Sequence, residues 1–151
     1  MGTKAQPSLR AQAMRFLARR EHSREELRRK LVSRLAEGDD LEAVLDELAQ
    51  RGCLSDARFA EQVARAKARR YGPLKVAYYL KGRGVGEEAI SAGVRAAGDE
   101  GPASLEAIWR RRFREPAATD RERARQVRFL QGRGFALDEI LKFLKSRGEP
   151  E

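Results

Sequence analysis

An internal repeat with a period of about 50 residues constrains the fold of this chain more than any other feature. Residues 80–90, LKGRGVGEEAI, align with residues 130–140, LQGRGFALDEI, and Leu, Gly, Arg, Gly and Ile recur at the same places. Leu31 lies 49 residues before Leu80, and residues 31–41 form a degenerate and slightly longer copy. The chain of 151 residues is therefore expected to use one structural unit three times in tandem.

The hydrophobic pattern predicts that each unit is built from helices. Leu41, Val44, Leu45 and Leu48 are spaced at i, i+3, i+4 and i+7, which draws one apolar stripe along a helix. Similar stripes recur along the chain, and no segment reads well as a strand. The expected helices, three in each unit, cover residues 8–20, 23–36 and 40–51, then 55–70, 73–82 and 86–97, then 103–114, 120–132 and 136–147.

Polar residues and glycines mark where these helices begin and end. In a capping box, a short polar side chain accepts an orphan amide N–H, and a glutamate three residues later reaches back. Gly72 and Pro73 separate two helices, because proline suits the first helical position. The expected capping pairs are Ser23 with Glu26, Asp39 with Glu42 and Thr119 with Glu122, and the expected C-terminal stops are Gly52, Gly84, Gly134 and Gly148.

A three-helix unit of about 45 residues buries only a thin core, so neighbouring units should lean on one another. We therefore predict an all-α fold in which three tandem three-helix repeats stack into an elongated molecule that can be curved. The predicted division is a flexible tail over residues 1–7 and repeats over residues 8–52, 53–98 and 99–151. Within it, residues 98–102, GDEGP, form the clearest linker.

Composition excludes several classes of function. The single cysteine, Cys53, cannot form an internal disulfide, and it argues for a reducing compartment. One cysteine and one histidine cannot build a usual zinc site, and Ser23 is better explained as a helix cap than as a nucleophile beside His22. No apolar run approaches the roughly 20 residues that cross a bilayer. We expect a soluble cytoplasmic protein with no catalytic residue, no metal, no cofactor and no membrane partner.

The charge balance points to an acidic partner. Lys and Arg total 32 against 23 Asp and Glu, giving a net charge of +9, which suits nucleic acid, an anionic membrane or an acidic protein surface. Residues 62–86 contain no Asp or Glu, so nothing local neutralises their cations, and their tyrosines could stack on bases. The candidate binding residues of this stretch are Arg65, Lys67, Arg69, Arg70, Tyr71, Lys75, Lys81 and Arg83.

Two further arginine concentrations follow in the third unit. The first is a run at Arg110, Arg111, Arg112 and Arg114. In the second, three arginines share one face of an expected helix, with two acidic residues beside them. These three candidate binding residues are Arg121, Arg125 and Arg128.

Five segments in a fixed order carry a family resemblance. They are residues 24–31 (REELRRKL), 48–60 (LAQRGCLSDARFA), 70–75 (RYGPLK), 80–85 (LKGRGV) and 128–135 (RFLQGRGF). Together they resemble the RecX family of bacterial regulatory proteins, over about residues 9–148. This chain departs from the family pattern in a longer turn at residues 36–40 and a loop at residues 115–118.

The resemblance implies a modulator and not an enzyme. RecX proteins bind the RecA recombinase, chiefly as its filament on single-stranded DNA, and suppress its ATPase, strand-exchange and coprotease activities. They consist of tandem three-helix repeats, and some also bind DNA directly. The implied setting is recombination, DNA repair and the SOS response. The alternative is a basic helical DNA-binding protein that acts independently of RecA. In either case we expect a monomer, because the repeats supply stacking partners to one another.

Overall fold

The computed structural model describes residues 6–98 and 103–148, and these form nine helices and no strand. The prediction of an all-α fold of tandem three-helix repeats is confirmed. The tail expected over residues 1–7 and the linker expected over residues 98–102 lie mostly outside the described residues. In chain order the helices are α1 (Leu9–Arg19), α2 (Arg24–Val32), α3 (Leu41–Gln50), α4 (Asp56–Lys67), α5 (Pro73–Gly82), α6 (Glu87–Gly98), α7 (Ala103–Arg112), α8 (Asp120–Gly132) and α9 (Leu137–Gly148).

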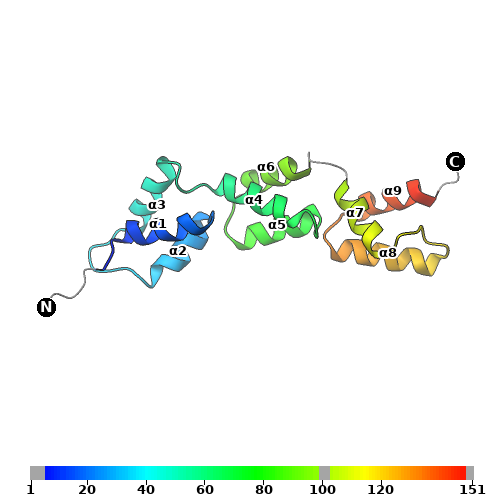
Figure 1. Ribbon diagram of the computed structural model, residues 1–151, viewed down its shortest axis with the longest axis horizontal. Coiled ribbons are helices and arrows are strands. Elements are labelled where there is room, and N and C mark those ends of the chain that lie inside the picture. The colour runs from blue at the N-terminus through cyan, green and yellow to red at the C-terminus, as the bar shows by residue number, and fades with distance from the viewer. Residues whose placement is uncertain (1–5, 99–102, 149–151) are drawn as a thin grey trace.

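The helices gather in three groups along one long axis (Figure 1). We call α1–α3, α4–α6 and α7–α9 the first, second and third unit. Each unit has a separate hydrophobic core, so no single core runs through the part of the chain that the structure describes. Full burial of one leucine stabilises a fold by about 1.5–3 kcal/mol. The largest contributions come from Leu27, Leu31, Leu45 and Leu48 in the first unit, Phe59 and Leu80 in the second, and Trp109, Leu130 and Ile140 in the third.

The second helix of the first unit is shorter than predicted. Residues 23–36 were expected to be helical, but α2 ends at Val32 and Ser33 is its C-cap. Leu27 and Leu31 are fully buried, whereas Leu35, the next member of their stripe, is 44% exposed. Leu35 therefore lies on the surface after the end of α2 and does not continue the buried stripe.

One of the three predicted helix caps needs a correction. The Ser23 capping box is confirmed, with both reciprocal hydrogen bonds present. Asp39 was predicted to cap α3, but Asp40 is the N-cap and its side chain accepts from the Ala43 amide. Asp39 instead accepts from the Ala36 amide and closes the preceding turn. Either aspartate could cap a helix, and only the chain path through the turn decides between them.

Thr119 caps α8 as predicted, because its hydroxyl oxygen accepts from the Glu122 amide. The reciprocal half of the box is different. The Glu122 carboxylate accepts from the amide of Ala118 and not from that of Thr119. The glutamate thereby ties the loop that precedes α8 to its first turn.

Each unit has a second helix, namely α2, α5 or α8. Neighbouring units meet where the C-terminal end of one of these helices lies against the N-terminal end of another. At the joint between the second and third units, the Gly72 amide donates to the Arg133 carbonyl (2.6 Å) and the Leu74 amide to the Gly134 carbonyl (3.0 Å). At the joint between the first and second units, the Ser23 hydroxyl donates to the Arg83 carbonyl (2.7 Å). Orphan carbonyls at one helix C-terminus thus face the N-terminus of the next helix, an arrangement that the helix dipoles favour.

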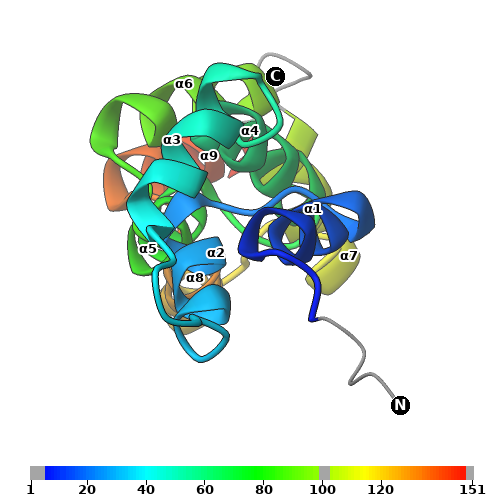
Figure 2. The same cartoon turned by 90° about the vertical axis from the view of Figure 1, so that its left-hand side faces the viewer.

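These joints line up α8, α5 and α2 along the long axis. Figure 1 shows them following one another along the lower edge, and Figure 2, which looks along the axis, shows them gathered on the same side. The molecule is therefore an elongated rod of three small domains connected end to end. The side chains around each joint come from two units at once.

The recurring Gly-Arg-Gly motif explains how neighbouring units can approach each other so closely at the joints. Gly84 and Gly134 have φ of +77° and +101°, as expected for glycines that stop helices. A Cβ on Gly84 would lie 2.5 Å from Cβ of Glu25, and a Cβ on Gly134 would lie 2.5 Å from Cβ of Lys75. The motif is therefore both a helix stop and the contact between units. Its period of about 50 residues matches the period of the joints.

Candidate functional site

Arginines of the first unit are largely used in ion pairs within the unit. Arg24 pairs with Glu42 (2.9 Å) and Asp46 (2.6 Å), and Arg28 pairs with Glu25 and with Glu42 (2.7 Å). Hydrogen bonds from Arg28 and then Arg24 lower the pKa of Glu42 to about 2. Positive charge on this unit is therefore balanced locally. The remaining paired arginines that α1–α3 and their loops contribute are Arg10, Arg20, Arg29 and Arg51.

The joint between the second and third units has the opposite character. A cleft of about 330 Å³ opens there, lined by basic and aromatic side chains from both units. We call it the arginine cleft. Its lining residues are Arg69, Arg70 and Tyr71, which follow α4; Ile108, Arg111 and Arg112 from α7; Phe129 from α8; and Arg133, which follows α8.

No ion pair in residues 6–98 and 103–148 involves any of these five arginines. Three helix C-termini deliver the arginines, and a helix C-terminus favours positive side chains through its dipole. The local backbone therefore tolerates this cluster of like charges without acidic neighbours.

Aromatic rings and carbonyl oxygens orient the cations of the cleft. The Arg133 guanidinium lies 5.1 Å from the ring centre of Phe129 and 5.7 Å from that of Tyr71. Arg112 lies 5.7 Å from the Phe129 ring centre. Arg111 donates from Nη2 to the carbonyl oxygen of Arg69 (2.7 Å). Cation–π contacts and carbonyl hydrogen bonds hold a guanidinium in place but leave its net charge uncompensated.

The structure brings three of the predicted site residues into this cleft, namely Arg69, Arg70 and Tyr71. Lys67 and Lys75 flank it, with their ammonium groups 5.7 and 4.7 Å from the Tyr71 ring centre. With Arg133, three cationic groups lie within 6 Å of the Tyr71 ring centre. Seven basic side chains of two units gather at this joint when both lysines are included.

The other predicted residues lie elsewhere. The interpretation that nothing local neutralises residues 62–86 is wrong for Arg65, which pairs with Glu61 at 2.8 Å, one turn earlier on α4. Arg83 lies at the first joint, 3.8 Å from Glu26 and over the Tyr79 ring. Lys81 is exposed near the end of α5. The exposed candidates of α8 are Arg121, Arg125 and Arg128.

Sequence reasoning did not select Arg111, Arg112, Phe129 or Arg133 as site residues. The run at residues 110–112 was visible, but nothing in it indicated which side chain faces the second unit. Arg133 could have been found from the repeat, because it occupies the position of the selected Arg83 at an offset of 50. The repeat offset of 50 residues shows which positions are equivalent in different units. It does not show which residues meet at a joint, and the cleft forms only there.

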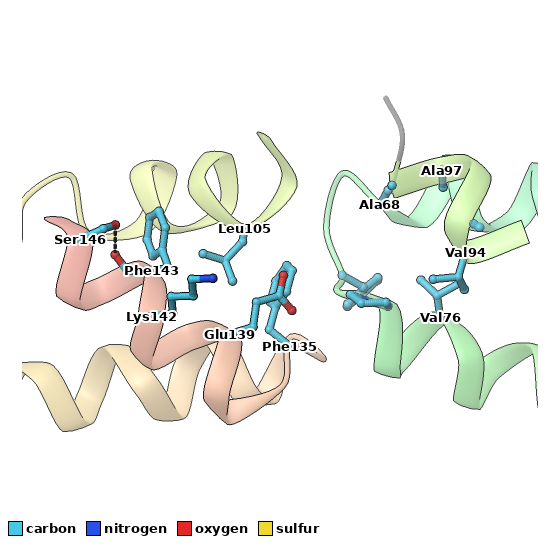
Figure 3. Close-up of a pocket in the computed structure, with 14 residues that line it drawn as sticks. Ala68, Val76, Val94, Ala97, Leu105, Phe135, Glu139, Lys142, Phe143 and Ser146 are labelled. Carbon is cyan, nitrogen blue, oxygen red and sulfur yellow. Dashed lines mark hydrogen bonds between the residues drawn. The ribbon is translucent and has the colours of Figure 1, made fainter. Parts of the chain in front are cut away.

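A second, largely apolar cavity of about 470 Å³ lies between the same two units, with Glu139 and Lys142 also among its lining residues, and Tyr71 lines both spaces. Figure 3 shows Val76 and Val94 of the second unit facing Leu105 and Phe135 of the third across it. The two units therefore touch through their helix-end joint and leave space around it.

Comparisons with known proteins identify the family. The models of the first, second and third three-helix domains of RecX match residues 10–48, 55–93 and 99–144. The chain belongs to the RecX family. A "Regulatory protein RecX" of Pseudomonas fluorescens is 43% identical over 142 residues, covering 93% of this chain and 92% of that protein. The RecX relative from Leptothrix cholodnii is 39% identical over 140 residues, covering 93% and 89%.

Solved RecX structures share the fold. The crystal structure of RecX from Lactobacillus salivarius superimposes with a TM-score of 0.71 at 18% identity, covering 91% of this chain and 95% of that one. A second RecX crystal structure gives a TM-score of 0.67 at 18% identity, covering 91% and 73%. The relatives are named as regulatory proteins. Among the described residues of this family member, no helix is long and apolar enough to span a membrane, and no group of three metal-ligating side chains is present.

Proposed function

We propose that this protein regulates the RecA recombinase by binding the RecA filament on single-stranded DNA. Binding inhibits the ATPase, strand-exchange and coprotease activities of the filament and so modulates recombination, DNA repair and the SOS response. Membership of the RecX family supports the role of regulator. The arginine cleft is the observation that supports a binding site, because its five guanidinium groups have no acidic partner among the described residues.

The proposed mechanism is occlusion. An elongated rod with its cations concentrated at one joint presents them to the acidic surfaces and phosphates of a filament. The exposed arginines of α8, Arg121, Arg125 and Arg128, extend the same charge along the third unit. A rod lying on the filament blocks its groove or favours its disassembly. On this proposal the protein is a cytoplasmic monomer that acts by binding and not by catalysis.

The test is the ATPase rate of RecA on single-stranded DNA as the protein is titrated in, with binding to the same DNA measured beside it at matched salt. Direct filament regulation predicts that hydrolysis falls at protein concentrations well below those that coat the free DNA. An ATPase rate that stays constant until the DNA is saturated would contradict it.

A second candidate function is DNA binding independent of RecA. The same cleft favours it, because unpaired arginines suit phosphates as well as carboxylates. It predicts tight binding to DNA alone, with affinity that falls steeply as salt rises because counterions are released. Any effect on RecA would then reflect competition for the strand.

A further inference from the structure

We propose that the arginine cleft binds the phosphates of a single-stranded nucleic acid, and that the bound strand bridges the second and third units and fixes the angle between them. The proposal deepens the proposed function, because it assigns a ligand class to the same cleft. It concerns the chain without RecA, so it can fail while filament regulation stands.

The first support is a difference between the two joints. Carboxylates connect the first and second units: Glu21 pairs with Arg58 (2.9 Å), and the Asp56 side chain accepts from the Arg24 amide (2.8 Å). Glu26, in addition, lies 3.8 Å from Arg83. Opposite charges from two units hold that joint together.

At the second joint, backbone carbonyl oxygens accept the hydrogen bonds that connect residues 6–98 to residues 103–148. The donors are the amides of Gly72 and Leu74, the Lys75 ammonium, which donates to the Gly132 carbonyl (3.4 Å), and Arg111. No described carboxylate takes part. No acidic side chain is among the residues that line the cleft, where Arg69 and Arg70 of the second unit meet three arginines of the third, and like charges in one cleft repel.

The second support is the chemistry of the lining. A guanidinium group donates two parallel hydrogen bonds to a phosphate, and five of them offer more positive charge than one carboxylate could balance. A nucleic-acid strand supplies a negative charge at each nucleotide. The volume of about 330 Å³ accommodates a nucleotide-sized group, and a flexible single strand can follow such a cleft where a stiff duplex does not bend.

The third support concerns the aromatic residues. Tyr71 has Lys67, Lys75 and Arg133 within 6 Å of its ring centre, and Phe129 has Arg112 and Arg133. Because cationic groups already lie against the Tyr71 and Phe129 rings, the rings position these cations and do not stack on bases. Binding at the cleft should therefore depend on phosphates and be insensitive to sequence.

Bridging follows from the position of the cleft. Arg69 and Arg70 belong to one unit and Arg111, Arg112 and Arg133 to the next, so one strand that contacts both groups neutralises their repulsion. The apolar cavity of about 470 Å³ at the same joint leaves space for the units to rotate. A bound strand should therefore change the relative position of the second and third units and leave the first joint unchanged.

Binding is tested with the full-length chain and a fluorescent oligothymidylate. Two double variants remove the cleft arginines of one unit each: Arg69→Ala with Arg70→Ala, and Arg111→Ala with Arg112→Ala. Each should weaken binding at least roughly tenfold and make the affinity less dependent on salt. The control, Arg15→Ala with Arg19→Ala on α1, makes the same change in net charge at exposed positions of the first unit. Equal losses in control and cleft variants would overturn the site. Equally tight binding of a polyglutamate or of a duplex of the same length would overturn the choice of ligand.

Bridging is tested by fluorescence energy transfer in a Cys53→Ala background. Labels at Ser91→Cys and Lys145→Cys span the second joint, and labels at Ala18→Cys and Ser91→Cys span the first; all three positions are exposed. Saturating oligothymidylate should change the transfer across the second joint only. Unchanged transfer there would overturn bridging. If the unaltered protein did not bind the oligonucleotide but still inhibited RecA, the inference would be overturned and the proposed function would stand.

Discussion

Gly134 lies against Lys75 at the joint between the second and third units, so closely that a Cβ on residue 134 would be 2.5 Å from Cβ of Lys75 and 2.7 Å from its amide nitrogen. Gly134 also has a φ of +101°. We predict that Gly134→Ala destabilises the protein by about 1–3 kcal/mol, because the left-handed backbone and the clash both oppose a side chain. Urea unfolding monitored by circular dichroism measures the loss.

Gly132→Ala is the matched control, two residues earlier at the end of α8. A Cβ there meets nothing within 4 Å, and alanine favours a helical position over glycine by about 0.5–1 kcal/mol. Gly132→Ala should therefore leave stability equal or slightly raised. If the two variants were equally stable, the close contact at the joint would not be what requires glycine.

Reversing charge in the arginine cleft should weaken regulation of RecA. The double variant Arg69→Glu with Arg70→Glu places two negative charges beside the remaining cleft arginines. These charges repel an acidic partner, whereas the helices of the fold stay intact. We expect the protein concentration needed to halve RecA ATPase activity to rise at least roughly tenfold, by analogy with the loss of buried or networked charge contacts, with an unchanged circular dichroism spectrum. Arg15→Glu with Arg19→Glu is the control, and unchanged inhibition by the cleft variant would contradict the proposed site.

The core of the third unit contains a buried polar pair that can be tested separately. The Trp109 indole Nε1–H donates to Gln126 Oε1 (2.9 Å), and both side chains are buried. Gln126→Leu keeps much of the volume but leaves the indole N–H without an acceptor, which should cost about 1–3 kcal/mol. Trp109 is the only tryptophan, so its fluorescence reports the unfolding of this unit. Gln131→Leu, at an exposed position next to the end of the same helix, should leave the transition unchanged.

The helices could be predicted because their signals are local. The stripe of Leu41, Leu45 and Leu48 and the cap at Ser23 depend on residues within one or two turns. Where two local signals competed, prediction was wrong: Asp39 and Asp40 are equivalent caps in sequence, and the turn that leads into α3 selects the second.

The cleft could be predicted only in part, because it forms between units. Arg69, Arg70 and Tyr71 were selected for lying in an acid-free stretch, and the same criterion also selected Arg65, which has Glu61 one turn away. Arg111 and Arg69 are 42 residues apart, and no local sequence signal places the Arg111 side chain next to the Arg69 carbonyl. That contact depends on how the two units meet at the joint. The sequence identified the glycines of the joints as helix stops, but it did not indicate that neighbouring units touch at them.

His22 gives the fold a pH dependence that can be worked out from its contacts. Its ring is buried beside the first joint, with Nδ1 2.9 Å from the Arg20 carbonyl and Nε2 2.8 Å from the Lys30 ammonium. Because lysine donates, Nε2 accepts and Nδ1–H donates, which is the neutral ring. Burial, and then the charges of Arg20 and Lys30, lower the pKa of His22 below 6.5, against the opposing effects of the Arg20 carbonyl and Glu26.

The unfolded chain therefore binds a proton at His22 more readily than the folded chain does, so this contribution to stability is complete above pH 6.5 and declines as pH falls from there toward the lower folded pKa. We predict that the free energy of unfolding, measured in urea, drops between pH 7.5 and 5.5. In His22→Gln, which keeps a polar side chain without a titratable ring, that drop should be smaller. An equal drop in both proteins would assign the pH dependence to other groups.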